Sequence, residues 1–221
     1  MRHAPIRIAF ARTLLCGLLI FPVMQPLAAE PLASWREGQS REAIEAFVSA
    51  VTEVGGPEYI APAERIAVFD NDGTLWSEQP MYFQVLFAMD EIKRMAPQHP
   101  QWREQQPFKA VLENDHQALA AQGMDGMMKI VLATHAGVSS EDFIARSRSW
   151  LASARHPRTG KPYTEMVFQP VLGLLDYLRD NGFKTFIVSG GEVAFMRAFA
   201  EEVYGIPPEQ VIGTTLGASL Q

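Results

Sequence analysis

The sequence predicts an α/β fold in which a parallel sheet is interrupted by a long helical insert. Two mainly apolar runs, residues 66–69 and 183–188, predict strands, and each is followed by polar residues and glycine. The four consecutive apolar residues of the first run suit a strand buried on both faces of a parallel sheet. The turn Asp180-Asn181-Gly182 leads directly from a helical pattern into the second run, which is typical of a βαβ unit. Between the two runs, residues 77–165 contain helical patterns and no sequence signal for a strand of comparable strength.

The opening segment differs from the globular remainder of the chain. Three arginines precede an apolar run, residues 14–23, and small residues follow it at positions 27–29. This pattern is typical of a secretory signal peptide cut after Ala29, and we expect a secreted or periplasmic bacterial protein. An uncleaved membrane anchor is the alternative, but Pro22, Pro26 and the shortness of the apolar run disfavour a spanning helix.

Composition is that of a globular chain, with 221 residues, of which 48% are hydrophobic and 20% charged. The one cysteine, Cys16, lies in the expected signal peptide, so the mature chain has no disulfide. Cleavage removes three arginines and no acid, which takes the formal charge from −6 to −9. An acidic surface disfavours nucleic acid and anionic membranes as partners. A phosphate site in this chain must be locally positive, through a metal ion, a lysine or backbone amides.

The remaining elements follow from apolar residues at helical or strand spacing and from capping residues. Ser139 and Asp142 form a variant of the capping box at the start of the last helix of the insert. We expect helices over residues 40–54, 81–95, 107–123, 127–135, 139–151, 170–180 and 192–204, and a third strand over 211–213. The domains are then a signal peptide, a discontinuous sheet core and a helical cap, covering residues 1–29, 30–76 with 166–221, and 77–165.

Two carboxylates, Asp70 and Asp72, stand where the first strand ends, followed by Gly73. Ligand sites of open α/β sheets lie at such ends, and in a loop both side chains can face one point. Two converging carboxylates repel unless a cation or a shared proton relieves them, and Mg²⁺ is the simplest cation for oxygen ligands. The alternative is an ordinary turn, since Asn, Asp and Gly favour turns. A calcium loop is disfavoured because a strand, not a helix, precedes the motif.

The second strand ends in Ser189, Gly190 and Gly191. We expect the helix that follows, residues 192–204, to direct free backbone amides at whatever binds beside Ser189. Because the carboxyl ends of parallel strands meet at one edge of a sheet, Ser189 and the two carboxylates are predicted to share a site.

The two motifs together resemble those of the haloacid dehalogenase (HAD) superfamily of phosphatases and phosphotransferases, hhhhDxDGT and hhhh[ST]G, where h is apolar. The phrase at residues 69–76, with a helical insert after it, is similar to secreted bacterial members described as phosphoserine phosphatase-like hydrolases. The resemblance covers about residues 40–215. It implies a Rossmann-like parallel sheet core with a helical cap inserted after the first core strand and placed over the active site.

The resemblance also implies a mechanism and a small phosphorylated substrate. Asp70 attacks phosphorus and forms an aspartyl-phosphate, and Asp72 protonates the leaving alkoxide and later deprotonates water. Mg²⁺ is held by an Asp70 oxygen, by the backbone carbonyl of Asp72 and by an acid from a later motif. Ser189 and the amide of Gly190 hold the phosphoryl oxygens. The second acid separates phosphatases from the dehalogenases of the superfamily, which lack it.

The sequence departs from the family pattern after the third strand. The family's third motif supplies a lysine and its fourth an acidic cluster, whereas residues 214–221 contain no Lys, Asp or Glu. Lys184 lies at the far end of the second strand and could not replace that lysine without a different fold, whereas Lys161, where the chain leaves the cap, is conceivable but disfavoured. We therefore expect a core that is incomplete on its C-terminal side and leaves residues 66–69 as an open apolar edge. The alternatives are a weak or inactive member that at most binds phosphate or a partner, and a site completed by a second chain.

Two further groups have less favoured functional interpretations. The basic stretch at residues 155–158 could contact an anionic substrate, but a solvated loop is the commoner outcome. His116 and His135 lack a paired His or Cys at ligand spacing, and we interpret both as structural. The identity of the phosphate ester and the oligomeric state stay open.

Overall fold

The computed structural model describes residues 32–215, which belong to the unit Pro31–Gln221. The expected signal peptide, with Cys16, lies outside these residues. None of the helices in the described part combines the length and the apolar character that crossing a membrane requires.

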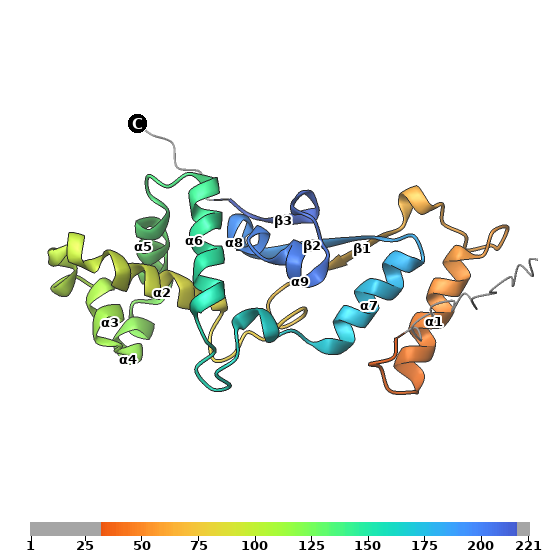
Figure 1. Cartoon of the computed structure of the whole chain (residues 1–221), viewed down its shortest axis with the longest axis horizontal. Helices are drawn as coiled ribbons and strands as arrows, with labels where there is room; N and C mark the ends of the chain where they lie inside the picture. Colours follow the sequence, from red (N-terminus) through yellow and green to blue (C-terminus); the bar gives the residue numbers. More distant parts are fainter. Residues whose placement is uncertain (1–31, 216–221) are drawn as a thin grey trace, which may run out of the picture. The chain divides into compact units, whose positions relative to one another are not determined.

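Three parallel strands form the sheet of the described residues, in the order β1 (Ile66–Phe69), β2 (Lys184–Glu192) and β3 (Val211–Thr214), as Figure 1 shows. In the register of the first pair, Ile66 lies beside Lys184 and Phe69 beside Ile187. This arrangement confirms the predicted α/β fold with a parallel core sheet.

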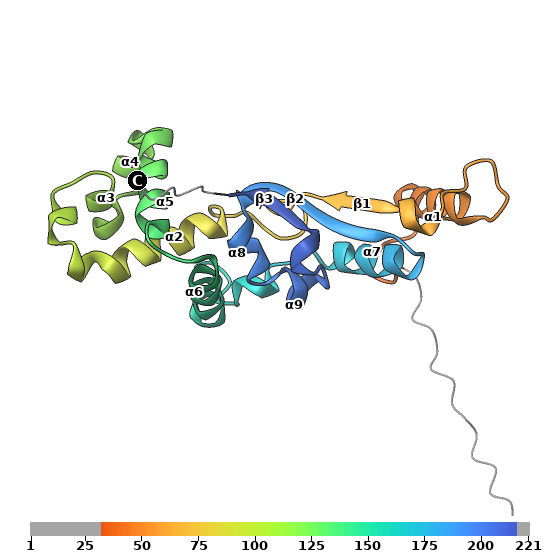
Figure 2. The same ribbon diagram turned by 90° about the horizontal axis from the view of Figure 1, so that it is seen from above.

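One face of the sheet is covered by helices. Ile187 of β2 and Val211 of β3 are buried in the main hydrophobic cluster, together with side chains of the covering helices. These helices lie on the same side of the sheet in Figure 2 and are α7 (Gln169–Asp180), α8 (Val193–Arg197) and α9 (Ala200–Tyr204).

The opposite face is apolar and open within the described residues. Its exposed apolar side chains come from all three strands and are Ile66 (57% exposed), Val68 (58%), Val188 (44%) and Ile212 (52%). The expectation that the first strand is buried on both faces is therefore wrong. Side chains alternate along a strand, and helices cover one face only, so every second residue of β1 stays exposed. Within residues 32–215, β1 also has β2 as its single neighbour.

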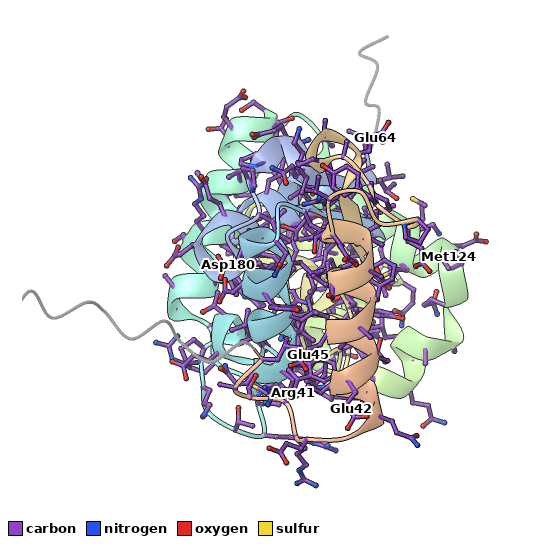
Figure 3. The ribbon with its side chains drawn as sticks, turned by 90° about the vertical axis from the view of Figure 1, so that its right-hand side faces the viewer. Arg41, Glu42, Glu45, Glu64, Met124 and Asp180 are labelled. Carbon is purple, nitrogen blue, oxygen red and sulfur yellow. The ribbon has the colours of Figure 1, made fainter. Side chains whose placement is uncertain are left out.

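Helix α1 (Gln39–Thr52) packs beside α7 and the sheet. Val48 and Val51 are buried against Leu178 and Phe183. The polar side of the helix carries Arg41, whose Nε donates to Glu45 Oε1 at 2.8 Å, and Figure 3 labels both side chains.

The insert is helical, as predicted, and its helices are α2 (Phe83–Met95), α3 (Phe108–Glu113), α4 (His116–Ala121), α5 (Gly123–His135) and α6 (Ser140–Ser153). The single helix expected over residues 107–123 is wrong, because Asn114 takes a left-handed conformation (φ 55°) and ends α3. Asp115 then caps α4 by accepting from the Ala118 amide at 2.9 Å. The predicted cap of α6 is confirmed, since Ser139 Oγ accepts from the Asp142 amide at 3.1 Å.

Helix α2 joins two apolar clusters. Phe83 and Phe87 on one side belong to the cluster that covers the sheet. Ala88, Met89 and Ile92 on the other side belong to a second cluster inside the insert. The insert therefore has a small core of its own and also shares the main one.

The helix expected over residues 192–204 is also two helices, α8 and α9. Phe199 departs from helical geometry (φ −138°), and its buried ring stacks on Trp76 with ring centroids 4.2 Å apart. Tertiary packing here overrides helix propensity. Short 3₁₀ turns complete the elements, at Pro62–Glu64, Ala96–Gln98, Pro100–Arg103, Tyr163–Glu165 and Pro208–Gln210.

The segment that leaves the core for the insert is hydrogen-bonded to the segment that returns from it, and we call this pair of segments the neck. The Ser77 amide donates to the Met166 carbonyl at 2.9 Å, and the Phe168 amide donates to the Leu75 carbonyl at 3.0 Å. The predicted limits of the cap, residues 77 and 165, lie next to this pairing.

His156 stabilises the base of the insert. Its side chain is 4% exposed, and Nε2 lies 2.8 Å from the Gln79 carbonyl oxygen. Its Nδ1 accepts from the amides of Arg158 and Thr159 at 3.3 and 3.2 Å. The interpretation of residues 155–158 as a solvated loop is therefore wrong for His156, which is a buried structural residue.

Candidate active site

A cavity of about 440 Å³ lies where β1 ends, beside the end of β2. We call it the Asp70 cavity. It brings together all four residues that the two motifs nominated for the site: Asp70, Asp72, Ser189 and Gly190. Gly191 of β2 also lines the cavity. The rest of the lining comes from α2, the residue before it, and α5, and consists of Tyr82, Gln84, Val85, Ala88, Met124, Met127 and Val131. The roles of these residues in catalysis stay a prediction.

Asp70 follows directly on the last residue of β1. Because Phe69 pairs with Ile187, the register places Asp70 near the level of Ser189 on β2. The Asp70 side chain is exposed, and its Oδ1 accepts from the Asn71 amide at 2.8 Å. It is therefore an accessible carboxylate held at the end of a strand.

The loop after Asp70 is a compact turn, as the turn interpretation expects, and the two carboxylates of the motif, Asp70 and Asp72, also line the cavity. The Asn71 carbonyl accepts from the amides of Leu75 at 2.8 Å and of Thr74 at 3.2 Å. Gly73 has φ +74°, which favours glycine, and a Cβ there would lie 3.3 Å from the Glu78 carboxylate. The glycine thus lets the loop close with Asp72 facing the cavity.

Asp72 differs from Asp70 in its surroundings. The indole Nε1–H of Trp76 donates to Asp72 Oδ1 at 2.7 Å. Burial raises the pKa of Asp72 above its ordinary value, hydrogen bonds from Trp76 and Asn71 oppose that rise, and the charges of Asp70 and Glu78 add to it. A carboxyl with a raised pKa holds its proton more readily than an ordinary aspartate, which suits a general acid.

Trp76 is a residue whose role the sequence motif did not indicate. Its side chain is fully buried between Phe199, 4.2 Å away between ring centroids, and Phe83, 4.8 Å away. Packing on both sides fixes the indole and therefore fixes the direction of the hydrogen bond to Asp72. The sequence alone could not predict this role of Trp76, because Phe199 is far from it along the chain.

Two more buried contacts support the loop and the strand beside it. The Tyr204 hydroxyl donates to Asn71 Oδ1 at 3.4 Å. Gln84 Oε1 accepts from the Glu192 amide at 3.0 Å and so joins α2 to the end of β2. Sequence reasoning missed both contacts for the same reason, since each joins segments more than a hundred residues apart.

At the second motif, Ser189 Oγ accepts from the Gly191 amide at 3.3 Å. The Glu192 carboxylate accepts from the Phe195 amide at 2.6 Å and caps α8. The expectation of free amides at this helix start is wrong for Phe195, because an acidic side chain of the same segment already satisfies it.

No lysine or arginine is among the cavity-lining residues of the described chain. Lys184 begins β2 beside Ile66, at the opposite end of the strand from Asp70, and Lys161 is exposed. His135 stacks on Phe143 at 4.2 Å and lines no part of this cavity. His116 begins α4 and is likewise not in the cavity lining.

A magnesium ion fits the oxygen ligands that are present. Across residues 32–215 no three His, Cys, Asp or Glu side chains are grouped as a metal site, so an all-protein cage is absent there. Mg²⁺ commonly binds through one or two carboxylates, waters and substrate phosphate. Asp70 supplies a carboxylate at this cavity, and the backbone carbonyl of Asp72 is the second protein oxygen that the family resemblance implies.

The chain is similar to one known protein family and to a solved structure. A model of the haloacid dehalogenase-like hydrolase family matches residues 67–219. Among solved structures, the chain is similar to the crystal structure of a phosphoserine phosphohydrolase-like protein from Francisella tularensis subsp. tularensis SCHU S4. The two share 19% identity at a TM-score of 0.35, over 67% of this chain and 57% of that one.

The chain thus spans little more than half the length of that structure. A search of curated proteins gives no match. The family match covers most of the chain, including the first-motif carboxylates, the entire insert and Ser189. The chain belongs to the haloacid dehalogenase-like hydrolases.

Proposed function

We propose that this hydrolase is a Mg²⁺-dependent phosphomonoesterase that acts through an aspartyl-phosphate at Asp70. The observation that supports it is the single cavity shared by an accessible carboxylate, a half-buried carboxyl with a raised pKa, and Ser189. Phosphoryl transfer requires a positioned nucleophile, an acid for the leaving group and stabilisation of the phosphoryl oxygens. Asp70, Asp72, and Ser189 with Gly190 would supply these in turn.

In the first step, an Asp70 carboxylate oxygen attacks phosphorus and the ester P–O bond breaks. The departing alkoxide takes the proton that Asp72 holds, which leaves Asp72 ionised. In the second step, Asp72 takes a proton from water as the water oxygen attacks phosphorus. The P–O bond to Asp70 breaks, inorganic phosphate leaves, and both carboxyls return to their initial states.

An Asp70 carboxylate oxygen and the backbone carbonyl of Asp72 would also hold Mg²⁺. The ion would offset the repulsion between the attacking carboxylate and the phosphate dianion. The Ser189 hydroxyl and the Gly190 amide, on the neighbouring strand β2, would hold the phosphoryl oxygens.

An assay with p-nitrophenyl phosphate and Mg²⁺ tests the proposal. We expect Asp70→Asn to lower turnover by roughly 10³-fold or more, because it removes the nucleophile. Asp180→Asn is the matched control, since Asp180 is an exposed aspartate on α7 (Figure 3). Equal rates for wild type and Asp70→Asn would overturn the proposal.

A second candidate function is phosphate binding without turnover. The lack of lysine and arginine among the described lining residues favours it, because a hydrolase gains rate from each fixed cation. Calorimetric titration of the wild type with orthophosphate and Mg²⁺, beside the assay, separates the two candidates. Binding without any Asp70-dependent turnover would favour this second candidate.

We also propose that the protein is exported, on the basis of its first 29 residues. Cell fractionation followed by N-terminal sequencing should find the chain outside the cytoplasm and beginning at Glu30. A chain recovered in the cytoplasm with Met1 would contradict this.

A further inference from the structure

The side of the Asp70 cavity that belongs to the insert is apolar. Two helices build it, and the side chains that face the cavity are Val85 and Ala88 of α2 with Met124, Met127 and Val131 of α5. The carboxylates and Ser189 line the same cavity from the sheet. A phosphate ester whose phosphoryl group lies at Asp70 therefore places its alcohol portion against these five side chains.

The polar groups on this side are few. Tyr82, directly before α2, and Gln84 of α2 are the remaining residues on this side, and the Gln84 oxygen already accepts from the Glu192 amide at 3.0 Å. Within residues 32–215 no cationic side chain lines the cavity. A carboxylate on the leaving group would lie against the apolar side chains of the insert with no cationic side chain beside it, and sugar-like hydroxyls there would lose water for at most two partners, Tyr82 and Gln84.

We infer that the substrate is a phosphate monoester of an apolar alcohol, with an alkyl or aryl leaving group that packs against α2 and α5. This inference rests on the proposed phosphatase function. The cavity volume of about 440 Å³ lies in the range of small-molecule sites. Apolar contact is the interaction that its insert side offers, so the leaving group is selected by hydrophobic burial.

The two methionines of α5 that line the cavity, Met124 and Met127, make this selection tolerant of shape. Methionine is unbranched and adapts to irregular apolar partners. Met124 is 76% exposed and lies at the margin of the view in Figure 3, whereas Met127 is half-buried. A cavity with such a lining accepts alkyl leaving groups of different lengths, and kcat/KM should rise gradually as the alkyl chain lengthens.

The test measures kcat/KM for ethyl, butyl and hexyl phosphate, and for glycerol 3-phosphate and phosphoserine. These are all alkyl esters, so differences in leaving-group reactivity stay small. We expect kcat/KM to rise roughly two- to fourfold per added methylene, as partial to full burial of each CH₂ predicts. Hexyl phosphate should exceed phosphoserine by at least roughly tenfold on the same basis.

Met127→Gln and Met128→Gln are the matched variants. They make the same change at neighbouring positions of α5, but Met127 lines the cavity and Met128, 45% exposed, does not. Met127→Gln should reduce the hexyl-to-ethyl ratio by roughly fivefold or more, because it places an amide against the chain. Met128→Gln should leave the ratio unchanged.

Titration with ethylphosphonate and hexylphosphonate, whose P–C bond is not hydrolysed, separates failure of this inference from failure of the proposed function. Turnover with a flat chain-length series, or with phosphoserine preferred, overturns the inference and leaves the phosphatase standing. No turnover, together with Met127-dependent preference for hexylphosphonate, overturns the phosphatase and supports the apolar site. No turnover and no such preference overturns both.

Discussion

The two faces of the sheet are built from the same strands but have different surroundings. Ile187 on β2 is fully buried beneath helices, whereas its neighbour Val188 is 44% exposed on the other face. Both faces are apolar in sequence. An apolar strand sequence therefore does not predict by itself that both faces are buried, because burial depends on whether other elements cover each face.

The covered face is also the one that supports the candidate site. Trp76, Phe199 and Tyr204 belong to its hydrophobic cluster, and Trp76 and Tyr204 donate hydrogen bonds to the loop of the first motif. The open face makes no such contribution in the described residues. Substitutions on the two faces should therefore differ in their effects on stability and on the site.

The largest difference is expected for Ile187→Ala against Val188→Ala. Ile187→Ala should lower the free energy of unfolding by about 2–5 kcal/mol, because it leaves a cavity in the main cluster. Val188→Ala, at an exposed position, should cost less than about 1 kcal/mol. Urea denaturation followed by circular dichroism measures both. Equal costs would mean that the open face is covered in solution.

Trp76→Phe tests the hydrogen bond between the covered face and the site. The variant keeps an aromatic ring against Phe199 but removes the donor to Asp72, and we expect a loss of about 1.5–3 kcal/mol in stability together with lower kcat. Trp150→Phe is the matched control, because Trp150 Nε1 donates to the exposed Asp90 carboxylate at 2.9 Å. Its cost should stay below about 1 kcal/mol. Equal costs would contradict a special role for the buried pair.

Tyr204→Phe should change how stability depends on alkaline pH. Burial, and secondarily the Asp72 charge, raises the pKa of Tyr204 well above its ordinary value, so the folded chain keeps the phenol neutral. The unfolded chain ionises near pH 10, so stability is fully present below that pH and falls above it, by about 1.4 kcal/mol per pH unit. The variant should lose less stability above pH 10 in urea denaturations. Parallel pH curves for the two proteins would contradict this.

The smallest effect on stability is expected for Val68→Thr combined with Ile212→Thr on the open face. Threonine keeps the preference for strands, and both positions are more than half exposed, so stability should change by no more than about 0.5 kcal/mol. The binding of a fluorescent apolar dye such as ANS should fall, because two exposed apolar side chains are removed. A loss of several kcal/mol would show that this face is packed against something.

The sequence allowed prediction of features that depend on neighbouring residues. The strand before Asp70, the cap at Ser139 and the convergence of the two motifs on one sheet edge all follow from local patterns and from parallel topology. The breaks at Asn114 and Phe199 did not, because a left-handed turn and a ring stacked on Trp76 depend on tertiary packing. The raised pKa of Asp72 likewise depends on the burial of its side chain in the fold, which the sequence around the motif does not reveal.

The neck holds the two ends of the insert close together in the fold. Ser77 and Met166 are joined by a backbone hydrogen bond, so the two cut ends of the core would lie close enough for a loop of a few residues. The insert also fills part of the main cluster, with Phe83, Phe87, Phe143, Leu151 and Tyr163, so a replacement segment must supply equivalent buried side chains. Given those side chains, inserts exchanged between relatives at this junction would change one side of the Asp70 cavity while Asp70 and Ser189 keep their positions.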